Sequence, residues 1–315
     1  MVARQAHNLK VGGSIPPSAT NTSRYTAAFL FSEVMRTPEQ IELSRLQNRL
    51  TKRFHKACAD YSLIENGDHI LIALSGGKDS LALVELLGKR AQIFVPRFKV
   101  TALHVRVKER AYISDLSYLQ SFCDAFRVPL LVRDTSIGES SVSASGVPTN
   151  NMQWGASSGL SSVSASGVPT NNMQWGASGG LSAKRSNPCF LCSWYRRKAL
   201  FDTAQELGCN KIAFGHHKDD IVETLLMNLV FEGKFSTIYP KLQMDKMPLQ
   251  LIRPLCLIEE RDLRRYAELQ GYVRQKQPCP FEHDSVRSNI KDLVTQLEQL
   301  NPNVRDSLWG AIARR

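Results

Sequence analysis

The stretch Ser75–Ser80, of sequence Ser-Gly-Gly-Lys-Asp-Ser, constrains the fold of this chain more than any other. It follows the apolar run Ile70–Leu74 and precedes the apolar run Leu81–Leu87, so it predicts a strand, a tight turn and the start of a helix. Glycines let backbone N–H groups approach an anion, and a helix start adds unpaired N–H groups and partial positive charge. We therefore expect a phosphate-binding loop here.

The side chains of this loop have distinct expected roles. Lys78 adds a full positive charge, Asp79 is suited to hold a Mg²⁺ that bridges phosphate oxygens, and Ser80 is placed to cap the helix. The pattern is neither a Walker loop nor GxGxxG, and an ordinary strand-to-helix turn is the alternative. The predicted nucleotide contacts are Ser75, Gly76, Gly77, Lys78, Asp79 and Ser80.

Apolar runs of strand length alternate with helical segments along the chain. The strand-like runs cover residues 70–74, 98–105, 129–134, 211–214 and 249–255, and the helical segments include 38–61, 115–126 and 259–271. This alternation predicts an α/β fold, a doubly wound, mostly parallel five-stranded sheet with helices on both faces. Ligands of such sheets bind at the carboxyl ends of the strands.

A second polar block, of sequence Gly-His-His-Lys-Asp-Asp, ends the fourth predicted strand. Because this strand end and the phosphate loop belong to the same edge of one sheet, we expect the block to contact the nucleotide as well. The expected contacts are Gly215, His216, Asp219 and Asp220. His104 ends the second predicted strand, where it either lines the nucleotide pocket or has no role.

The seven cysteines are spread thinly, with no secretory signal peptide before them. This usage indicates a reducing compartment, and we expect a cytoplasmic protein. Cys189 and Cys192 stand at metal-ligand spacing, and Cys279 and His283 follow. The spacing fits a structural zinc site of three thiolates and one imidazole as well as it fits an iron-sulfur centre. The remaining cysteines are interpreted as core thiols, one of which could carry a persulfide: Cys58, Cys123, Cys209 and Cys256.

The charge balance favours a polyanionic partner. Lysine and arginine exceed aspartate and glutamate by 40 − 29 = 11, and each phosphate that a basic surface neutralises releases counterions. Charge alone does not separate RNA from DNA, and a basic surface with no dedicated ligand is the alternative. No run approaches the roughly 18 to 20 apolar residues of a membrane span, so we expect no membrane association.

Composition also predicts the domain organisation. Residues 140–157 recur letter for letter as 161–178 without a charged residue, and such polar sequence buries too little apolar surface to offset its ordering entropy. A lid or RNA-contacting loop is the alternative for this repeat. We expect a disordered arm at 1–37, one α/β domain from 38–138 and 183–275, a flexible insertion at 139–182 and a C-terminal segment at 276–315. The sequence of this arm favours a misassigned start codon, and Met35 is then the expected first residue of the protein.

Together these motifs resemble the tRNA 2-thiocytidine synthetase family of the PP-loop ATPase superfamily. Members of that family place a CxxC between the phosphate loop and a Gly-His-His block, with one further cysteine near the C-terminus. The matching residues are Ser75–Ser80, Cys189, Cys192, Trp194–Lys198, Gly215–Asp220, Arg253–Leu255 and Cys279. The resemblance covers residues 40–290 and fails over the insertion and the N-terminal arm.

The resemblance implies a tRNA sulfurtransferase that converts cytidine 32 of the anticodon loop to 2-thiocytidine. Its cofactors would be ATP, Mg²⁺ at Asp79 and a [4Fe-4S] cluster held by Cys189, Cys192 and Cys279. Adenylation of the base O2 would make AMP the leaving group, and a sulfur nucleophile would then attack C2. The implied catalytic residues are Lys78, Asp79, Cys189 and Cys192. The expected partners are tRNA, a sulfur donor (a cysteine desulfurase or sulfide) and a second copy of the chain in a homodimer.

Three alternatives stay open at this point. Wobble-uridine thiolases and lysidine synthetases share the ATP loop, although the first typically add zinc-ribbon CxxC pairs at their ends and the second need no CxxC. A zinc-containing, non-catalytic RNA-binding protein on the same scaffold is the third. The intact charged residues Lys78, Asp79, Asp219 and Asp220 argue against that third alternative.

Overall fold

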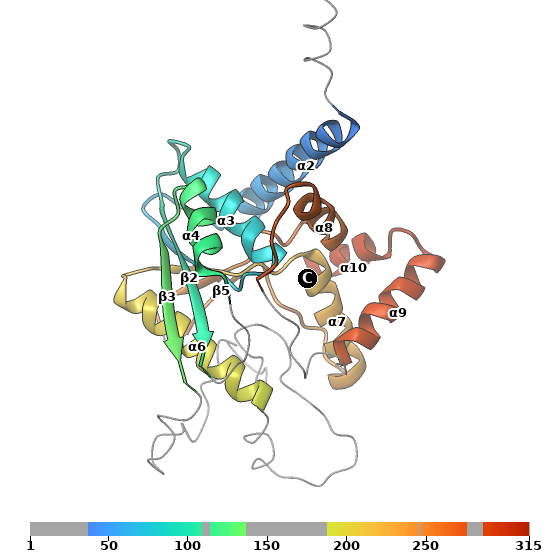
Figure 1. Ribbon diagram of the computed structural model, residues 1–315. Helices are drawn as coiled ribbons and strands as arrows, with labels where there is room; N and C mark the ends of the chain where they lie inside the picture. The colour runs from blue at the N-terminus through green and yellow to red at the C-terminus, as the bar shows by residue number, and fades with distance from the viewer. Residues whose placement is uncertain (1–36, 109–113, 137–187, 246, 276–285, 315) are drawn as a thin grey trace, which may run out of the picture. The chain divides into compact units, whose positions relative to one another are not determined.

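The computed structural model describes residues 37–108, 114–136, 188–245, 247–275 and 286–314 (Figure 1). The chain divides into two compact units, residues 1–44 and 45–315, and each is considered by itself. The predicted insertion, nearly all of the predicted arm, and Cys279 lie outside the described residues. The predicted domain boundaries therefore stay predictions.

Six strands form one sheet in the order β3-β2-β1-β4-β6-β5. They are β1 His69–Ala73, β2 Lys99–Val107, β3 Leu130–Thr135, β4 Lys211–Ala213, β5 Lys241–Gln243 and β6 Gln250–Ile252. Neighbouring strands are parallel, except that β5 runs antiparallel to β6. The predicted α/β class with a doubly wound, mostly parallel sheet is confirmed, with six strands in place of five. The additional strand, β5, was not predicted because its three residues are too few to give an alternating pattern.

The strand order determines where a ligand is expected. From β1 the chain adds β2 and β3 on one side, and it then returns to add β4 and β6 on the other side. The connections that leave β1 and β4 therefore diverge at one edge of the sheet. Ligands of doubly wound sheets bind outside the carboxyl ends of the strands at such a reversal point, so the loops after β1 and β4 are the candidate site.

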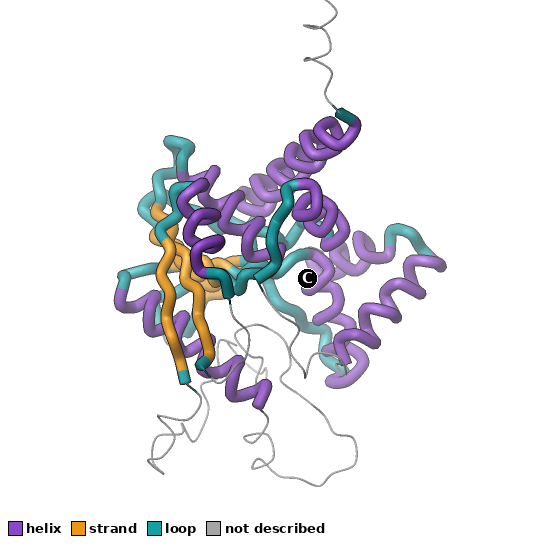
Figure 2. The backbone as a smooth tube through the Cα atoms, viewed as in Figure 1, coloured by secondary structure: helices purple, strands orange, loops and turns teal. Residues whose placement is uncertain are grey.

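Helices cover both faces of the sheet (Figures 1 and 2). In the described residues they are α2 Pro38–Asp60, α3 Lys78–Ala91, α4 Leu116–Ala125, α6 Pro188–Glu206, α7 Lys218–Glu232, α8 Glu260–Leu269, α9 Val286–Leu300 and α10 Val304–Ala313. Because parallel crossovers are right-handed, α6, which leads back across the sheet, lies on the face opposite α3 and α4. The prediction ended the last helix near Leu300 and missed α10. No helix within the described ranges has the length and apolar character needed to cross a bilayer.

The apolar strand runs anchor the edge at which the loops diverge. One core cluster joins four adjacent strands to α6, and its members at 2% exposure or less include Leu71, Leu103, Ile212, Leu251 and Phe201. Burying each such side chain is worth about 1.5–3 kcal/mol relative to leaving it in water. The carboxyl ends of β1 and β4 are therefore held side by side by packing, and the loops that follow them inherit that placement.

Candidate nucleotide-binding site

The phosphate loop connects β1, which ends at Ala73, to α3, which begins at Lys78. Gly77 takes the N-cap position, and among the residues that the structure describes no side-chain hydrogen bond caps the helix. The expected cap by Ser80 is wrong, because the helix begins two residues earlier. Its Oγ instead donates to the Gly77 carbonyl at 2.9 Å. The N–H groups of the first turn of α3 are thus left to an anion rather than to a capping side chain.

Gly76 needs to be glycine for two reasons. Its φ of +83° lies in the left-handed region, which residues with a Cβ rarely adopt. A Cβ built on it would also lie 2.7 Å from Cβ of Gln275. The backbone N–H of Gln275 donates to the Gly76 carbonyl at 2.9 Å, and its Oε1 accepts from the Asp115 N–H at 2.8 Å. Gln275 therefore fixes the shape of the loop from outside it.

Gly215 brings the second polar block against the phosphate loop. A Cβ on Gly215 would lie 3.2 Å from the carbonyl carbon of Asp79 and 3.2 Å from the backbone nitrogen of Ser80. Such contacts are tighter than side chains normally tolerate, so glycine permits the close approach. The chain after β4 thus lies against the first turn of α3, and the two blocks meet as the sequence predicts.

Asp79 has the geometry expected of a Mg²⁺ ligand. Among the described residues, its Oδ1 is a buried carboxylate oxygen with no hydrogen-bond partner, and its Oδ2 lies 3.1 Å from Lys78 Nζ. A buried polar atom without a partner is costly unless an ion, water or ligand satisfies it. Mg²⁺ takes carboxylate oxygens together with substrate phosphates, so Asp79 fits a cation beside the helix start.

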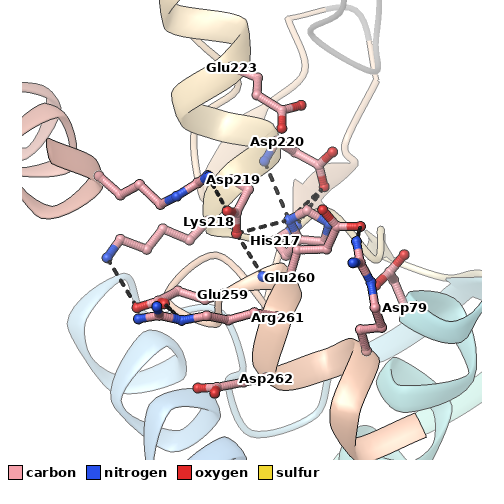
Figure 3. Close-up of polar contacts among 12 residues, drawn as sticks. Asp79, His217, Lys218, Asp219, Asp220, Glu223, Glu259, Glu260, Arg261 and Asp262 are labelled. Carbon is pink, nitrogen blue, oxygen red and sulfur yellow. Dashed lines mark hydrogen bonds and ion pairs between the residues drawn. The ribbon is translucent and has the colours of Figure 1, made fainter. Parts of the chain in front are cut away.

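Asp219, by contrast, already has partners for both oxygens (Figure 3). Its Oδ2 accepts from the backbone N–H of Glu260, the first residue of α8, at 2.7 Å. Its Oδ1 pairs with Arg305 of α10. The side chain of Asp219 is only 7% exposed, so these contacts tie α7, α8 and α10 together.

Asp220 is half of a capping box that begins α7 (Figure 3). Its Oδ2 accepts from the backbone N–H of His217 at 2.9 Å, and its Oδ1 accepts from Arg287 of α9 at 2.8 Å. Burial raises the pKa of Asp220, but its interactions with His217 and with the positive charge of Arg287 outweigh burial and hold that pKa below its usual value. All four oxygens of the two aspartates are engaged, so the geometry favours a structural role. Direct nucleotide binding by Asp219 and Asp220 stays a prediction.

The two predicted histidines are both neutral and buried. Burial, with a smaller contribution from the charge of Arg253, lowers the pKa of His216 to about 3; its Nδ1 is buried and lacks a partner in the described part of the chain. His104 Nδ1 lies 2.8 Å from the Leu74 carbonyl and Nε2 lies 3.0 Å from Ser114 Oγ. Because burial also lowers its pKa and both ring nitrogens are occupied, the structure favours a positioning role for His104.

The cysteines divide into ligand candidates and core thiols. Cys192 is buried in the first turns of α6, and Cys189 begins the same helix, but the side chain of Cys189 and all of Cys279 lie outside the described residues. The three-thiolate centre therefore stays a prediction. Burial raises the pKa of the other four thiols, to about 12 for Cys58 and Cys123 and about 11 for Cys209. They stay protonated at neutral pH, which fits core thiols.

Sequence reasoning missed the residues that shape this site from a distance. They are Gln275, Glu260, Arg287, Lys291 and Arg305, on α8, the segment that follows α8, or the two C-terminal helices. None of them lies in a recognisable sequence motif, since a glutamine after a helix or a charged residue on a helix is ordinary. They are identified only by their contacts in the folded structure.

In the described part of the chain, the loop at the reversal point turns at a left-handed glycine, α3 starts without a side-chain cap, and one buried oxygen of Asp79 has no partner. These features are those of a PP-loop nucleotide-binding protein. The PP-loop domain family matches residues 44–151 of the chain. The tRNA-cytidine(32) 2-sulfurtransferase of Shewanella sp. (strain W3-18-1) is 30% identical over 284 residues, which cover 89% of this chain and 78% of the relative. That of Shewanella oneidensis is 30% identical over 283 residues, with the same coverage of both chains. The chain therefore belongs to the tRNA-cytidine(32) 2-sulfurtransferase family, as the motifs suggested.

A solved structure supports the fold. The U34-tRNA thiolase NcsA from Methanococcus maripaludis, determined with its [4Fe-4S] cluster, has a TM-score of 0.60 to this chain at 22% identity. The likeness covers 86% of this chain and 79% of the thiolase. The PP-loop type of α/β sheet is thus confirmed by both sequence and structure.

Proposed function

We propose that this chain thiolates tRNA at the expense of ATP, adenylating O2 of cytidine 32 and replacing that oxygen with sulfur to give 2-thiocytidine. Membership of the sulfurtransferase family supports the reaction and the substrate. The structural observation that carries the ATP-dependent step is Asp79 Oδ1, a buried oxygen without a partner in the described chain, beside the uncapped start of α3. The relatives do not favour thiouridine or lysidine synthesis.

The chemistry follows from the two steps of the exchange. The base O2 attacks the α-phosphorus of ATP, and the bond to pyrophosphate breaks. The N–H groups of the phosphate loop and Lys78 neutralise the charge on the leaving pyrophosphate. Asp79 would hold a Mg²⁺, which when bound would supply further positive charge to the phosphates. A sulfur nucleophile then attacks C2 of the adenylated base, and the bond between C2 and the AMP oxygen breaks. The former carbonyl oxygen of the base therefore leaves as part of AMP.

Cys189, Cys192 and Cys279 are the proposed ligands of the [4Fe-4S] cluster. The buried Cys192 supports this assignment, as does Gln275, which contacts Gly76 of the phosphate loop and precedes Cys279 by a stretch of four residues, at most about 14 Å when extended. When bound, a cluster with three protein thiolates offers one iron to a sulfur ligand. We further propose a cysteine desulfurase or sulfide as sulfur donor, a homodimer, and a cytoplasmic location.

Mass spectrometry of tRNA nucleosides tests the function. Cells without the gene should lack 2-thiocytidine, the wild-type gene should restore it, and the Asp79→Asn gene should not. Loss of a thiouridine or of lysidine instead would replace the proposed reaction by one of the alternatives. An unchanged nucleoside profile would contradict tRNA thiolation altogether.

Metal analysis of anaerobically purified protein tests the cluster separately. About four irons per chain are expected, and Cys192→Ala should lose them. Cys209→Ala is the matched control, because Cys209 is also a buried cysteine and should keep its iron. Stoichiometric zinc without iron would overturn the cluster and leave the adenylation step standing.

A further inference from the structure

Lys78, which the proposed mechanism directs at phosphate, is held by a carboxylate from another helix. Its Nζ lies 3.3 Å from Glu260 Oε1 and 3.1 Å from Asp79 Oδ2. The side chain of Lys78 is 27% exposed and that of Glu260 15%, so the pair is partly shielded from solvent and its attraction is stronger than that of a surface pair. A phosphate that enters the loop has to compete with Glu260 for this ammonium group.

Glu260 can release Lys78 at little cost. The same carboxylate contacts Arg264 through Oε1 at 3.0 Å and Lys291 of α9 through Oε2 at 2.5 Å. Removing one partner from a shielded charge is expensive when it leaves that charge unpaired. Here two cations stay on Glu260 after Lys78 moves, so the exchange of Lys78 between carboxylate and phosphate is nearly balanced.

The competitor is also fixed in place. The backbone N–H of Glu260 donates to Asp219 Oδ2 at 2.7 Å (Figure 3), which holds its backbone, and Arg264 and Lys291 hold its carboxylate. Because the Glu260 carboxylate stays in place, it weakens phosphate binding by the same amount in every complex in which Lys78 must leave it.

We propose that Glu260 is a positioning residue that competes with nucleotide phosphates for Lys78 and thereby limits the affinity of the site for ATP and pyrophosphate. The inference rests on the proposed function. Removing the competitor strengthens ground-state binding and slows the release of pyrophosphate, so KM for ATP falls, and kcat falls with it where that release limits turnover. A merely structural role for Glu260 would have the opposite signature, because damage to the site weakens binding.

Titration of the full-length protein with MgATP and with Mg-pyrophosphate tests the proposal. Glu260→Gln should bind both about three- to tenfold more tightly, since a partly shielded ion pair has that scale of effect. Glu260→Asp keeps the charge but shortens the reach to Lys78, so its gain should be smaller. Glu268→Gln is the matched control, the same change at an exposed position on α8, and its affinities should equal those of the wild type.

A double-mutant cycle shows whether Glu260 acts through Lys78. In a Lys78→Met background, Glu260→Gln should no longer change either affinity. An equal gain in that background, or a weaker or unchanged affinity in Glu260→Gln alone, would overturn the proposal. Wild-type protein that binds neither ligand would instead contradict the proposed ATP-dependent function, so the two failures are distinguishable.

Discussion

The two strand-to-helix turns of the site, Ser75–Ser80 after β1 and Gly215–Asp220 after β4, have similar sequences and different uses. Each has glycine, a lysine and aspartate beside a helix start. In the first turn no side chain caps the helix and Asp79 Oδ1 has no partner among the described residues. In the second turn His217 caps α7, and both aspartates are paired with arginines. The two turns therefore differ in the partners of their side chains rather than in their residue types. The first is suited to bind a ligand, and the second stabilises the fold.

The largest effect that this comparison predicts is on catalysis. Asp79→Asn removes the charge that would hold Mg²⁺, so ATP-dependent thiolation should fall about 1,000-fold, the scale of losing a group that stabilises transition-state charge. Stability should fall by less than about 1 kcal/mol, because Oδ1 has no hydrogen-bond partner among the described residues and Oδ2 makes only a partly exposed pair with Lys78, which keeps Glu260. Pyrophosphate release with tRNA and thermal unfolding measure the two quantities.

Asp124→Asn is the control for this prediction, since Asp124 is an exposed aspartate on α4 that accepts from Gln120. It should leave both rate and stability unchanged. Full activity in Asp79→Asn would show that the first turn does not hold the cation. The conclusion that the first turn binds a ligand, unlike the second, would then be wrong.

The second prediction concerns Asp219, where a substitution should lower stability and leave nucleotide binding almost unchanged. Asp219→Asn leaves Arg305 without one of its two carboxylate partners and weakens the acceptor of the Glu260 N–H. Arg305 keeps Glu298, so its charge is not left unpaired, but hydrogen bonds to a charged group are worth about 1.5–3 kcal/mol. The free energy of unfolding should therefore fall by about 2 kcal/mol. Denaturant unfolding measures it, and the affinity of the folded variant for MgATP should change less than twofold. Undiminished stability together with lost MgATP binding would make the second turn a ligand site after all.

The role of the first turn could be predicted from the sequence, whereas the partners that occupy the second turn could not. Apolar runs and paired glycines predict the strands, the phosphate loop and the meeting of the two blocks, because each signal is local and few residues can replace a glycine at Gly76 or Gly215. The partners of the second turn are not local: Arg287 and Arg305 follow the aspartates they bind by 67 and 86 residues. Any of the 40 lysines and arginines could have served, so the pairing exists only in the folded chain.

The third prediction concerns the support that the first turn receives from Gln275. Gly76→Ala should lower the free energy of unfolding by about 2 kcal/mol, of which about 1 comes from the left-handed backbone and the rest from the clash with Cβ of Gln275. Because the loop must shift, MgATP affinity should fall about tenfold, which is about 1.4 kcal/mol. Isothermal titration and denaturant unfolding provide the measurements.

Gly67→Ala separates the two causes. Gly67 has a φ of +89°, and no atom of the described chain lies within 4 Å of an added Cβ, so alanine there brings the backbone strain without the clash. It should lose about 1 kcal/mol of stability and keep its MgATP affinity. Equal effects at the two glycines would mean that Gln275 does not shape the loop.

The smallest predicted effect is a pH dependence that reports whether the second turn is closed. The pKa of His216 is lowered to about 3, whereas an unfolded histidine titrates near 6.5. Between these values the unfolded chain binds the proton and the folded chain does not, so stability falls as the pH falls. From pH 7.5 to 5.5 the loss due to His216 should be about 1.4 kcal/mol. The lowered pKa of Asp220 adds nothing in this window, because its carboxylate is ionised in both states there.

Comparing wild type with His216→Gln isolates this contribution, because burial also lowers the pKa of His55 and His104 and both stay in the variant. Denaturant unfolding at pH 7.5 and 5.5 should show a steeper loss for wild type. If the two proteins lose stability in parallel, His216 takes up a proton in the folded state. The second turn would then be open to solvent or ligand like the first, and the division between a turn for binding and a turn for support would not hold.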